Sequence, residues 1–237
     1  MYARSVEQND STETLTFGVS GKLIMNVLVM FDRQTNTLWS QMLGEAVQGP
    51  LQGAELQPVA SLQTTWQQWK ELHPETKALV TNGKGATDPY AEYYQNDFAG
   101  ASDEARQDLR LPRKALVTGV VVAGQAVAYD RTTLRQVELV NDTINGVPIL
   151  VLFAPETATS LVFERSIDSH TLTFRQGNER LELIDNETGS TWLLLTGTAT
   201  SGEFKGSTLT RVPSTTAFWF GWKDWHPETL VYRRGKE

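Results

Sequence analysis

Four runs of β-branched and apolar residues dominate the middle of the chain and predict strands. They span residues 116–122, 126–129, 137–140 and 149–153. Short polar segments separate the runs, and Asn145-Gly146 lies where a two-residue hairpin turn is expected, because both residues tolerate the positive φ of such a turn. Apolar runs alternating with tight turns predict antiparallel sheet in this region.

Two other segments repeat with the period of a helix. The spacing i, i+3, i+7 is shared by two sets of residues: Trp66, Trp69 and His73, and Trp219, Trp222 and His226. This spacing places each set on one face of a helix, and the proline after each histidine predicts the helix end. Thr64 or Thr65 is a suitable N-cap for the first helix. We therefore predict two short amphipathic helices, each docked on a sheet.

Both helices belong to a longer internal repeat. Residues 32–76 and 185–229 align without a gap and share about 17 of roughly 45 positions, several times the chance level. Among the shared pairs are Asp32/Asp185, Thr35/Thr188, Trp39/Trp192, Gly44/Gly197, Leu56/Leu209 and the four residues from His73 or His226 onward. With small length changes the match extends outward, from residues 14–17 to 171–174 and from residues 4–6 to 165–167. We expect the residues that are the same in both copies to be framework residues, which means that they stabilise the fold.

The repeat predicts a mainly β fold, of the β-rich α+β kind, built from two related units. Each unit is closed by a short Trp-x-x-Trp-x-x-x-His-Pro helix. We expect a first unit at residues 1–80, a connecting segment or ordered loop at 81–112, and a second, complete unit at 113–237. The apolar runs of the second unit have no counterpart in the first. We therefore expect an exposed sheet edge or apolar face in the first unit, where a partner chain or a second copy could bind.

Composition narrows the partners and the chemistry. The chain has 237 residues and a net charge of −7, and its Lys and Arg residues are scattered, so we expect no nucleic-acid partner. It contains no cysteine, which excludes disulfides, thiolate catalysis and cysteine metal sites. No apolar window reaches transmembrane length, so we expect no membrane span. The first residues contain no basic region followed by an apolar run, so the sequence as written predicts a cytoplasmic protein.

A set of motifs carries a family resemblance. In the second copy they are Val140-Asn141-Asp142-Thr143-Ile144-Asn145-Gly146-Val147-Pro148, Glu187-Thr188-Gly189-Ser190-Thr191-Trp192 and His226-Pro227-Glu228-Thr229; in the first, Leu15-Thr16-Phe17-Gly18 and Leu38-Trp39-Ser40-Gln41. Together they resemble the bacterial and archaeal family catalogued as domain of unknown function 3179. The resemblance implies an architecture but no activity, and it suggests a periplasmic or extracellular location.

The chain departs from this family at its start. The resemblance implies a complete first unit, often behind a signal peptide or lipoprotein anchor, with Tyr-Cys-Pro-x-Cys-Gly before the Leu-Thr-Phe strand. This chain has no such motif there, and residues 153–158 hold no cysteine at the corresponding place in the second copy. We therefore carry over no catalytic or metal residue and expect no cofactor. The short start has two alternative explanations. Either the given sequence begins at an internal methionine, or the protein functions in a short form whose missing strands come from another chain.

His73 and His226 are the first candidate site residues. The chain has three histidines, whereas a metal site normally needs three or four convergent ligands, so we predict no metal site. Each histidine could instead pair with a nearby carboxylate, Glu75 or Glu228. The alternative is a framework role, in which the histidine ends its helix, bonds the last carbonyls and interacts with the helix dipole.

Aromatic residues supply the other candidates. Tyr90, Tyr93 and Tyr94 cluster in the connecting segment and could bind a ligand or pin that segment to the protein surface. Six of the seven tryptophans occupy repeat positions, which predicts core. Trp225 is the exception, because the first copy has Leu72 there, and it fits either a larger core or a stacking platform.

These observations favour a non-catalytic ligand-binding or scaffold module whose functional surface lies where the two units meet. The ligand is unknown. The contrasting hypothesis is the remainder of a metal-binding or redox enzyme whose Cys-x-x-Cys element is absent from the chain. No glycine-rich phosphate loop, nucleophile elbow or His-Glu-x-x-His motif is present, so we lean against an enzyme.

Overall fold

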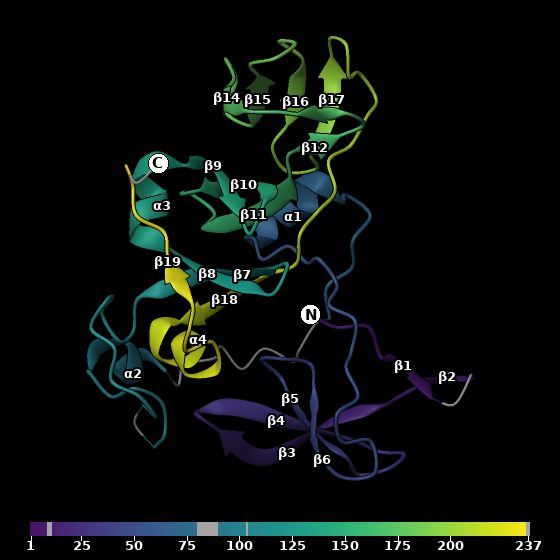
Figure 1. Ribbon diagram of the computed structural model, residues 1–237, viewed down its shortest axis with the longest axis vertical. Helices are drawn as coiled ribbons and strands as arrows, with labels where there is room; N and C mark the ends of the chain where they lie inside the picture. Colours follow the sequence, from purple (N-terminus) through teal and green to yellow (C-terminus); the bar gives the residue numbers. More distant parts are fainter. Residues whose placement is uncertain (9–10, 80–89, 103, 236–237) are drawn as a thin grey trace.

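The computed structural model describes residues 1–8, 11–79, 90–102 and 104–235. Within these residues the protein is mainly β, with several antiparallel sheets and four short helices, as predicted (Figure 1). We keep the names first unit (residues 1–80) and second unit (residues 113–237) for the two sequence repeats. None of the described helices is long and apolar enough to cross a membrane.

The first unit is a hairpin followed by a four-stranded sheet. The hairpin pairs β1 (Ser5–Gln8) with β2 (Ser11–Thr14). The sheet has the order β3-β4-β5-β6, from β3 (Phe17–Ile24), β4 (Val27–Asp32), β5 (Leu38–Ser40) and β6 (Ala46–Gln48). Helix α1 (Trp66–Leu72) follows, and α2 (Ala91–Gln95) lies in the connecting segment.

The second unit begins with two sheets that have no counterpart in the first. The sheet β18-β7-β8-β19 joins β7 (Leu116–Val122) and β8 (Gln125–Asp130) to β18 (Ser214–Phe218) and β19 (Leu230–Val231). Helix α3 (Arg131–Val137) leads into the sheet β11-β10-β9, from β9 (Leu139–Ile144), β10 (Val147–Ala154) and β11 (Thr159–Glu164). The two sheets face each other across a core of Val120, Tyr129, Ile149 and Val151.

The rest of the second unit resembles the first in its order of strands. The short pair β12 (Ser166–Ile167) and β13 (His170–Thr171) precedes the sheet β14-β15-β16-β17. Its strands are β14 (Phe174–Gln176), β15 (Glu182–Asp185), β16 (Thr191–Leu193) and β17 (Thr198–Ser201), and α4 (Trp219–Trp225) comes after them. Figure 1 shows this sheet at one end of the molecule and the sheet of the first unit at the other.

The predicted turn at Asn145-Gly146 joins β9 and β10. Both residues have positive φ, 46° and 83°, and Ile144 pairs with Val147 across the ladder. One predicted strand begins too early: residue 137 ends α3, and β9 starts at Leu139. The helix was missed because its start signal is a single side chain, Asp130, whose carboxylate accepts bonds from the backbone N–H groups of Thr132 and Thr133.

A buried carboxylate organises the sheet β3-β4-β5-β6, and an equivalent one organises the sheet β14-β15-β16-β17. Asp32 Oδ1 accepts from the backbone N–H of Thr35 at 2.6 Å, and Asp32 Oδ2 accepts from the indole N–H of Trp39 at 2.9 Å. The same bonds recur in the second unit from Thr188 and Trp192 to Asp185, at 2.6 and 2.8 Å. These bonds give the shared Asp-x-x-Thr-x-x-x-Trp pattern a structural role in both units. The duplication itself stays a prediction.

The two carboxylates stay charged although they are buried. Burial alone would raise the pKa of Asp32 and Asp185, but the hydrogen bonds from the tryptophan and the threonine outweigh it and lower the pKa of both groups. Each indole ring also packs edge-on against a phenylalanine, Phe17 in the first unit and Phe174 in the second.

Helices α1 and α4 end in the same way but differ in their N-caps and in their packing partners. Thr65 caps α1 by accepting from the N–H of Gln68, as predicted, and each helix ends at the histidine before its proline. Helix α4 packs on β7 of its own unit, where the ring of Trp222 lies against the bare backbone of Gly119. Helix α1 instead packs against the second unit, where Thr159 Oγ1 donates to Thr64 and Gln68 (Figure 1).

The different packing corrects one core prediction. Trp39, Trp192, Trp219 and Trp222 are buried, but Trp66 is 50% exposed. Because α1 meets the second unit through Gln68 and Leu72, its Trp66 side faces away from that contact.

We expect Asp185→Asn to destabilise the protein by about 1–3 kcal/mol, because it weakens charge-assisted bonds to a buried group. The lowered pKa of Asp185 gives a stability contribution that is present above about pH 4 and is lost as the pH falls through the folded-state pKa. Urea unfolding between neutral and acid pH therefore should show a shallower acid loss in the variant than in the wild type. The control is Asp97→Asn at an exposed position; equal losses in the two variants would contradict this account.

Candidate functional site

A cavity of about 490 Å³ lies between the sheet of the first unit and strand β18 of the second. Most of its lining is apolar. The residues are Met1, Tyr2, Ala3, Arg4, Phe17, Val27, Met30, Gln41, Met42 and Leu56 from the first unit, and Thr215, Thr216 and Ala217 from β18. Its size and apolar character are those of small-molecule and peptide pockets.

A second cavity of about 360 Å³ adjoins the first and holds His226. Met1, Tyr2, Met42, Leu56 and Thr215 line both cavities. The walls that are particular to the second one include Gly119, Trp222 and Glu55. The surface where the two units meet is therefore a pair of connected hollows with a shared wall.

Tyr2 fixes this shared wall. Its hydroxyl donates to the carbonyl of Met42 at 2.6 Å, and burial raises its pKa. Its ring lies against Gly44, which has φ +73° and has no room for a side chain on that side. Gly197, with φ +69°, holds the ring of Phe163 in the same way in the second unit. The turn after β5 thus needs glycine for both its backbone angle and its ring contact.

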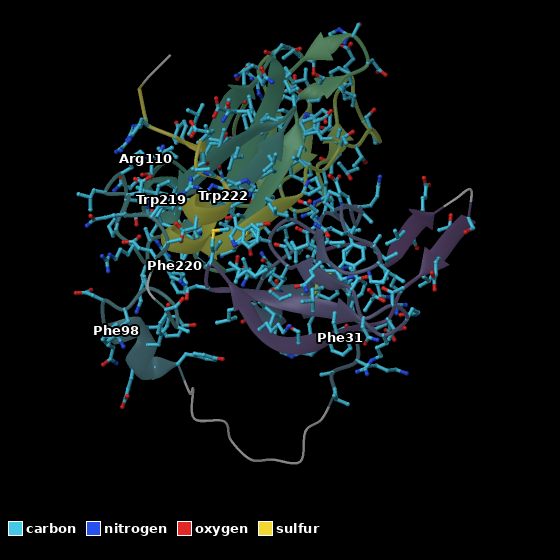
Figure 2. The ribbon with its side chains drawn as sticks, turned by 60° about the horizontal axis from the view of Figure 1, so that its bottom comes forward. Phe31, Phe98, Arg110, Trp219, Phe220 and Trp222 are labelled. Atoms are coloured by element: carbon cyan, nitrogen blue, oxygen red, sulfur yellow. The ribbon has the colours of Figure 1, made fainter. Side chains whose placement is uncertain are left out.

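One contact joins the first unit to the connecting segment, and another joins it to the second unit. The Oδ1 atom of Asn26, in the β3–β4 turn, accepts from the backbone N–H groups of Ala101 and Ser102 at 2.9 and 3.0 Å. Met42 packs against the buried cluster of Trp219 and Trp222 on α4. Figure 2 shows these tryptophans and Phe220 gathered on α4 beside the first sheet, while Phe31 lies further from α4 on that sheet.

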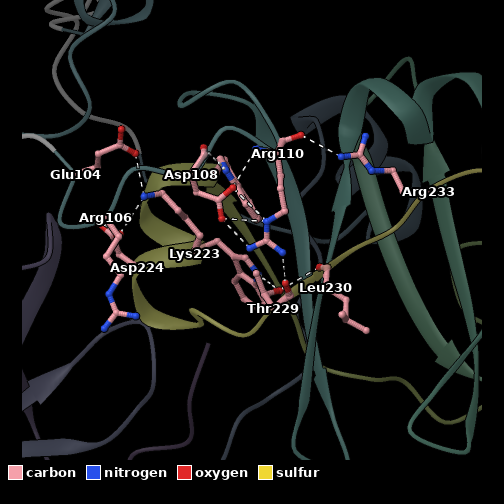
Figure 3. A network of polar contacts seen from close by, with 11 residues as sticks. Glu104, Arg106, Asp108, Arg110, Lys223, Asp224, Thr229, Leu230 and Arg233 are labelled. Carbon is pink, nitrogen blue, oxygen red and sulfur yellow. Dashed lines mark hydrogen bonds and ion pairs between the residues drawn. The ribbon is translucent and has the colours of Figure 1, made fainter.

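A buried ion network holds the connecting segment on α4 (Figure 3). Lys223 is 2% exposed and lies 2.9 Å from Glu104 and 3.2 Å from Asp224. Asp224 also accepts from the backbone N–H groups of Ala105 and Arg106. Further along the segment, Arg110 forms an ion pair with Asp108 and donates to the carbonyl of Thr229. These partners satisfy the buried charges, and we interpret the network as a structural one that holds the segment in place.

The two candidate histidines have the same local role in different surroundings. Each ring lies 4.2 Å from the ring of the preceding helix tryptophan, Trp69 or Trp222. Each tryptophan indole N–H donates to the threonine of the His-Pro-Glu-Thr motif, at 2.9 Å to Thr76 and 2.8 Å to Thr229. The residues that the two copies share here therefore have a structural role at the end of each helix.

His226 and His73 differ in exposure. His73 is exposed, whereas His226 is partly buried and lines the second cavity. Burial lowers the pKa of His226, which favours its neutral form. The expected interaction of a charged histidine with the helix dipole would raise that pKa, so burial dominates here.

The aromatic candidates lie apart from both cavities. Tyr93 and Tyr94 pack edge-on and tilted against Phe218, and the ammonium of Lys114 bonds the carbonyl of Tyr93. Tyr90 begins α2 and is 62% exposed. Trp225 is partly buried at the end of α4. Tyr93 and Tyr94 thus pack the connecting segment against the second unit.

Of the predicted site residues, the structure places His226 alone at the cavities. Tyr2, Arg4, Met42 and Thr215 line them without having been candidates. A signal existed for Arg4, because it matches Arg165 in the sequence repeat. Among the described residues, no group of three His, Asp or Glu side chains is placed to hold a metal ion.

The comparisons with known proteins give one match. The model of a family described as a protein of unknown function, DUF3179, matches residues 1–229. The chain belongs to this family. No curated protein and no solved structure matches it. Membership of DUF3179 agrees with the resemblance seen in the sequence and assigns no activity to either cavity.

We expect Lys223→Met to destabilise the protein by about 3–5 kcal/mol, because it removes the cation beside the buried carboxylate of Asp224 and one of the two cations that pair with Glu104, the other being Arg113. Lys70→Met is the matched control, since Lys70 is the exposed repeat counterpart and should change the free energy of unfolding by about 0.5 kcal/mol or less. Denaturant unfolding measures both. Similar effects of the two substitutions would show that the network does not hold the segment.

His226 should make the stability depend on pH near neutrality. Its folded-state pKa lies below the unfolded value of about 6.5, so its contribution is present above that pH and is lost as the pH falls through the folded-state pKa. His226→Phe keeps an aromatic ring on Trp222 and should reduce the loss of stability below neutral pH. His73→Phe is the control at the exposed site, and a larger effect of that variant would contradict the prediction.

Proposed function

We propose that this DUF3179 protein is a non-catalytic binding module whose ligand site is the larger cavity between the first unit and β18. The observation that supports the proposal is the composition of the wall: methionine, leucine, phenylalanine and alanine side chains surround a hollow of about 490 Å³. Apolar surface left in contact with water is unfavourable by about 25 cal/mol per Å², so an apolar ligand gains affinity there.

Few polar side chains line the cavity. Arg4 and Gln41 come from the first unit, and Thr215 and Thr216 come from β18. Such groups orient a ligand but supply no paired acid and base, which supports binding without chemistry. Three methionines, Met1, Met30 and Met42, add side chains that adapt easily to ligands of different shape.

We extend the proposal to where the protein acts. The family resemblance supports a periplasmic or extracellular location, in which an apolar ligand would reach the module outside the cytoplasm. A chain without cysteine is compatible with an oxidising compartment.

Nile red, a neutral apolar dye, tests the site. We expect saturable binding with a rise in fluorescence and one dye per chain. Thr215→Trp places a large ring at a position that lines both cavities and should weaken binding about tenfold or more. Thr14→Trp, at an exposed position of β2, is the control and should bind as the wild type does. The proposal fails if the dye does not bind saturably or if Thr215→Trp leaves binding unchanged.

A further inference from the structure

A third cavity, of about 460 Å³, lies between the edges of the two facing sheets of the second unit. One side of its lining comes from the edge strand β9 and the turn that follows it. The other side comes from β8, from the edge strand β19 and from the residues after β19. The two cavities described above share none of these residues, so a ligand here would be additional to that of the proposed function.

Asp142, in β9, gives this cavity a negative charge. Its Oδ2 atom accepts from the hydroxyl of Tyr129 at 2.6 Å, and its Oδ1 atom accepts from the backbone N–H of Thr143 at 2.7 Å. Burial and the bond to Asp142 raise the pKa of Tyr129, so this hydroxyl stays a donor at neutral pH. Each oxygen of a carboxylate can accept two bonds, so Asp142 is held in place and can still accept from a ligand.

Arg233, just after β19, gives the cavity a positive charge. It is exposed, and its guanidinium donates to the main-chain carbonyl of Arg110 at 3.3 Å (Figure 3). Arg110 also lines the cavity, but its own charge is matched by Asp108, at 2.7 Å. Arg233 thus keeps its charge and most of its N–H donors for a ligand.

The two charges do not neutralise each other. Within the described part of the chain, neither Asp142 nor Arg233 forms an ion pair, and Arg165 donates to the main-chain carbonyl of Asp142 instead of its carboxylate. A purely anionic ligand would be repelled by Asp142, and a purely cationic ligand by Arg233. A molecule that carries both an ammonium group and a carboxylate can satisfy both residues through charge-assisted hydrogen bonds.

We propose that this cavity binds a free α-amino acid, whose ammonium group donates to Asp142 and whose carboxylate accepts from Arg233. The apolar part of the lining suits the side chain of such a ligand and is formed by Val127, Ile144 and Leu230. Val127 and Ile144 are buried, whereas Leu230 is 55% exposed and would be covered by an apolar ligand side chain. We therefore expect a preference for apolar amino acids such as leucine.

Isothermal titration calorimetry of the intact protein with L-leucine tests the site. We expect saturable binding of one leucine per chain. Leucinamide lacks the carboxylate and N-acetyl-leucine lacks the ammonium group, so each should bind at least about tenfold more weakly than leucine. Leucylglycine carries the same two charges one peptide unit further apart, and it should also bind more weakly.

Two substitutions assign the two charges to residues. Arg233→Gln should weaken leucine binding about tenfold and leave the weak binding of leucinamide unchanged, because leucinamide has no carboxylate that could lose its partner. Asp142→Asn should weaken leucine binding to a similar extent and leave the weak binding of N-acetyl-leucine unchanged. Arg175→Gln, at an exposed position of β14, is the control and should bind leucine as the wild type does. Circular dichroism checks the folding of Asp142→Asn, and the exposed Arg233 gives a test that does not depend on it.

The outcomes separate this proposal from the proposed function. The amino-acid proposal is wrong if leucine does not bind saturably up to about 10 mM, or if Arg233→Gln binds leucine as tightly as the wild type does. Equal affinity for leucine and either single-charge analogue would also overturn it, and tighter binding of leucylglycine would assign the cavity to a short peptide. Leucine should not displace Nile red, since displacement would place leucine in the larger cavity. Failure of Nile red to bind would end the proposed function and leave leucine binding unaffected.

Discussion

The packing of Trp222 on Gly119 is the contact on which the rest of the structure depends. It fixes α4 on β7, and α4 then contacts two distant parts of the chain. Its buried Lys223 and Asp224 hold the connecting segment, and its tryptophans receive Met42 from the first unit. A side chain at residue 119 would push the helix away from the sheet and disturb all of these contacts together.

Much of the fold could be predicted because its signals are local. Apolar runs and the Asn145-Gly146 turn predicted the strands of the second unit, and prolines marked the ends of α1 and α4. Helix α3 could not be predicted with the same ease, because a seven-residue segment with β-branched residues depends on the cap from Asp130 and on packing of the buried Leu134. The predicted strand therefore starts at residue 137, two residues before β9 begins at Leu139.

The site was harder to predict because it is assembled from segments far apart in sequence. The wall residues Tyr2, Met42 and Thr215 meet only in three dimensions, and none carries a motif. The repeated Trp and His residues were candidates for a functional site. Their hydrogen bonds and ring contacts instead give them a structural role at the ends of two helices. Comparing the repeats was more informative than either copy alone, because matched residues such as Asp32 and Asp185 make the same hydrogen bonds in both copies.

Helix α1 packs against the second unit, so the sequence repeat and the packed regions of the protein have different boundaries. Although α1 belongs to the first copy by sequence, its polar contacts and its Leu72 are shared with residues beyond 150. Protection of its amides from exchange with solvent should therefore follow the opening of the second unit rather than that of the first sheet. The boundary that the sequence repeat predicts near residue 80 therefore does not coincide with the boundary set by packing, which falls between β6 and α1.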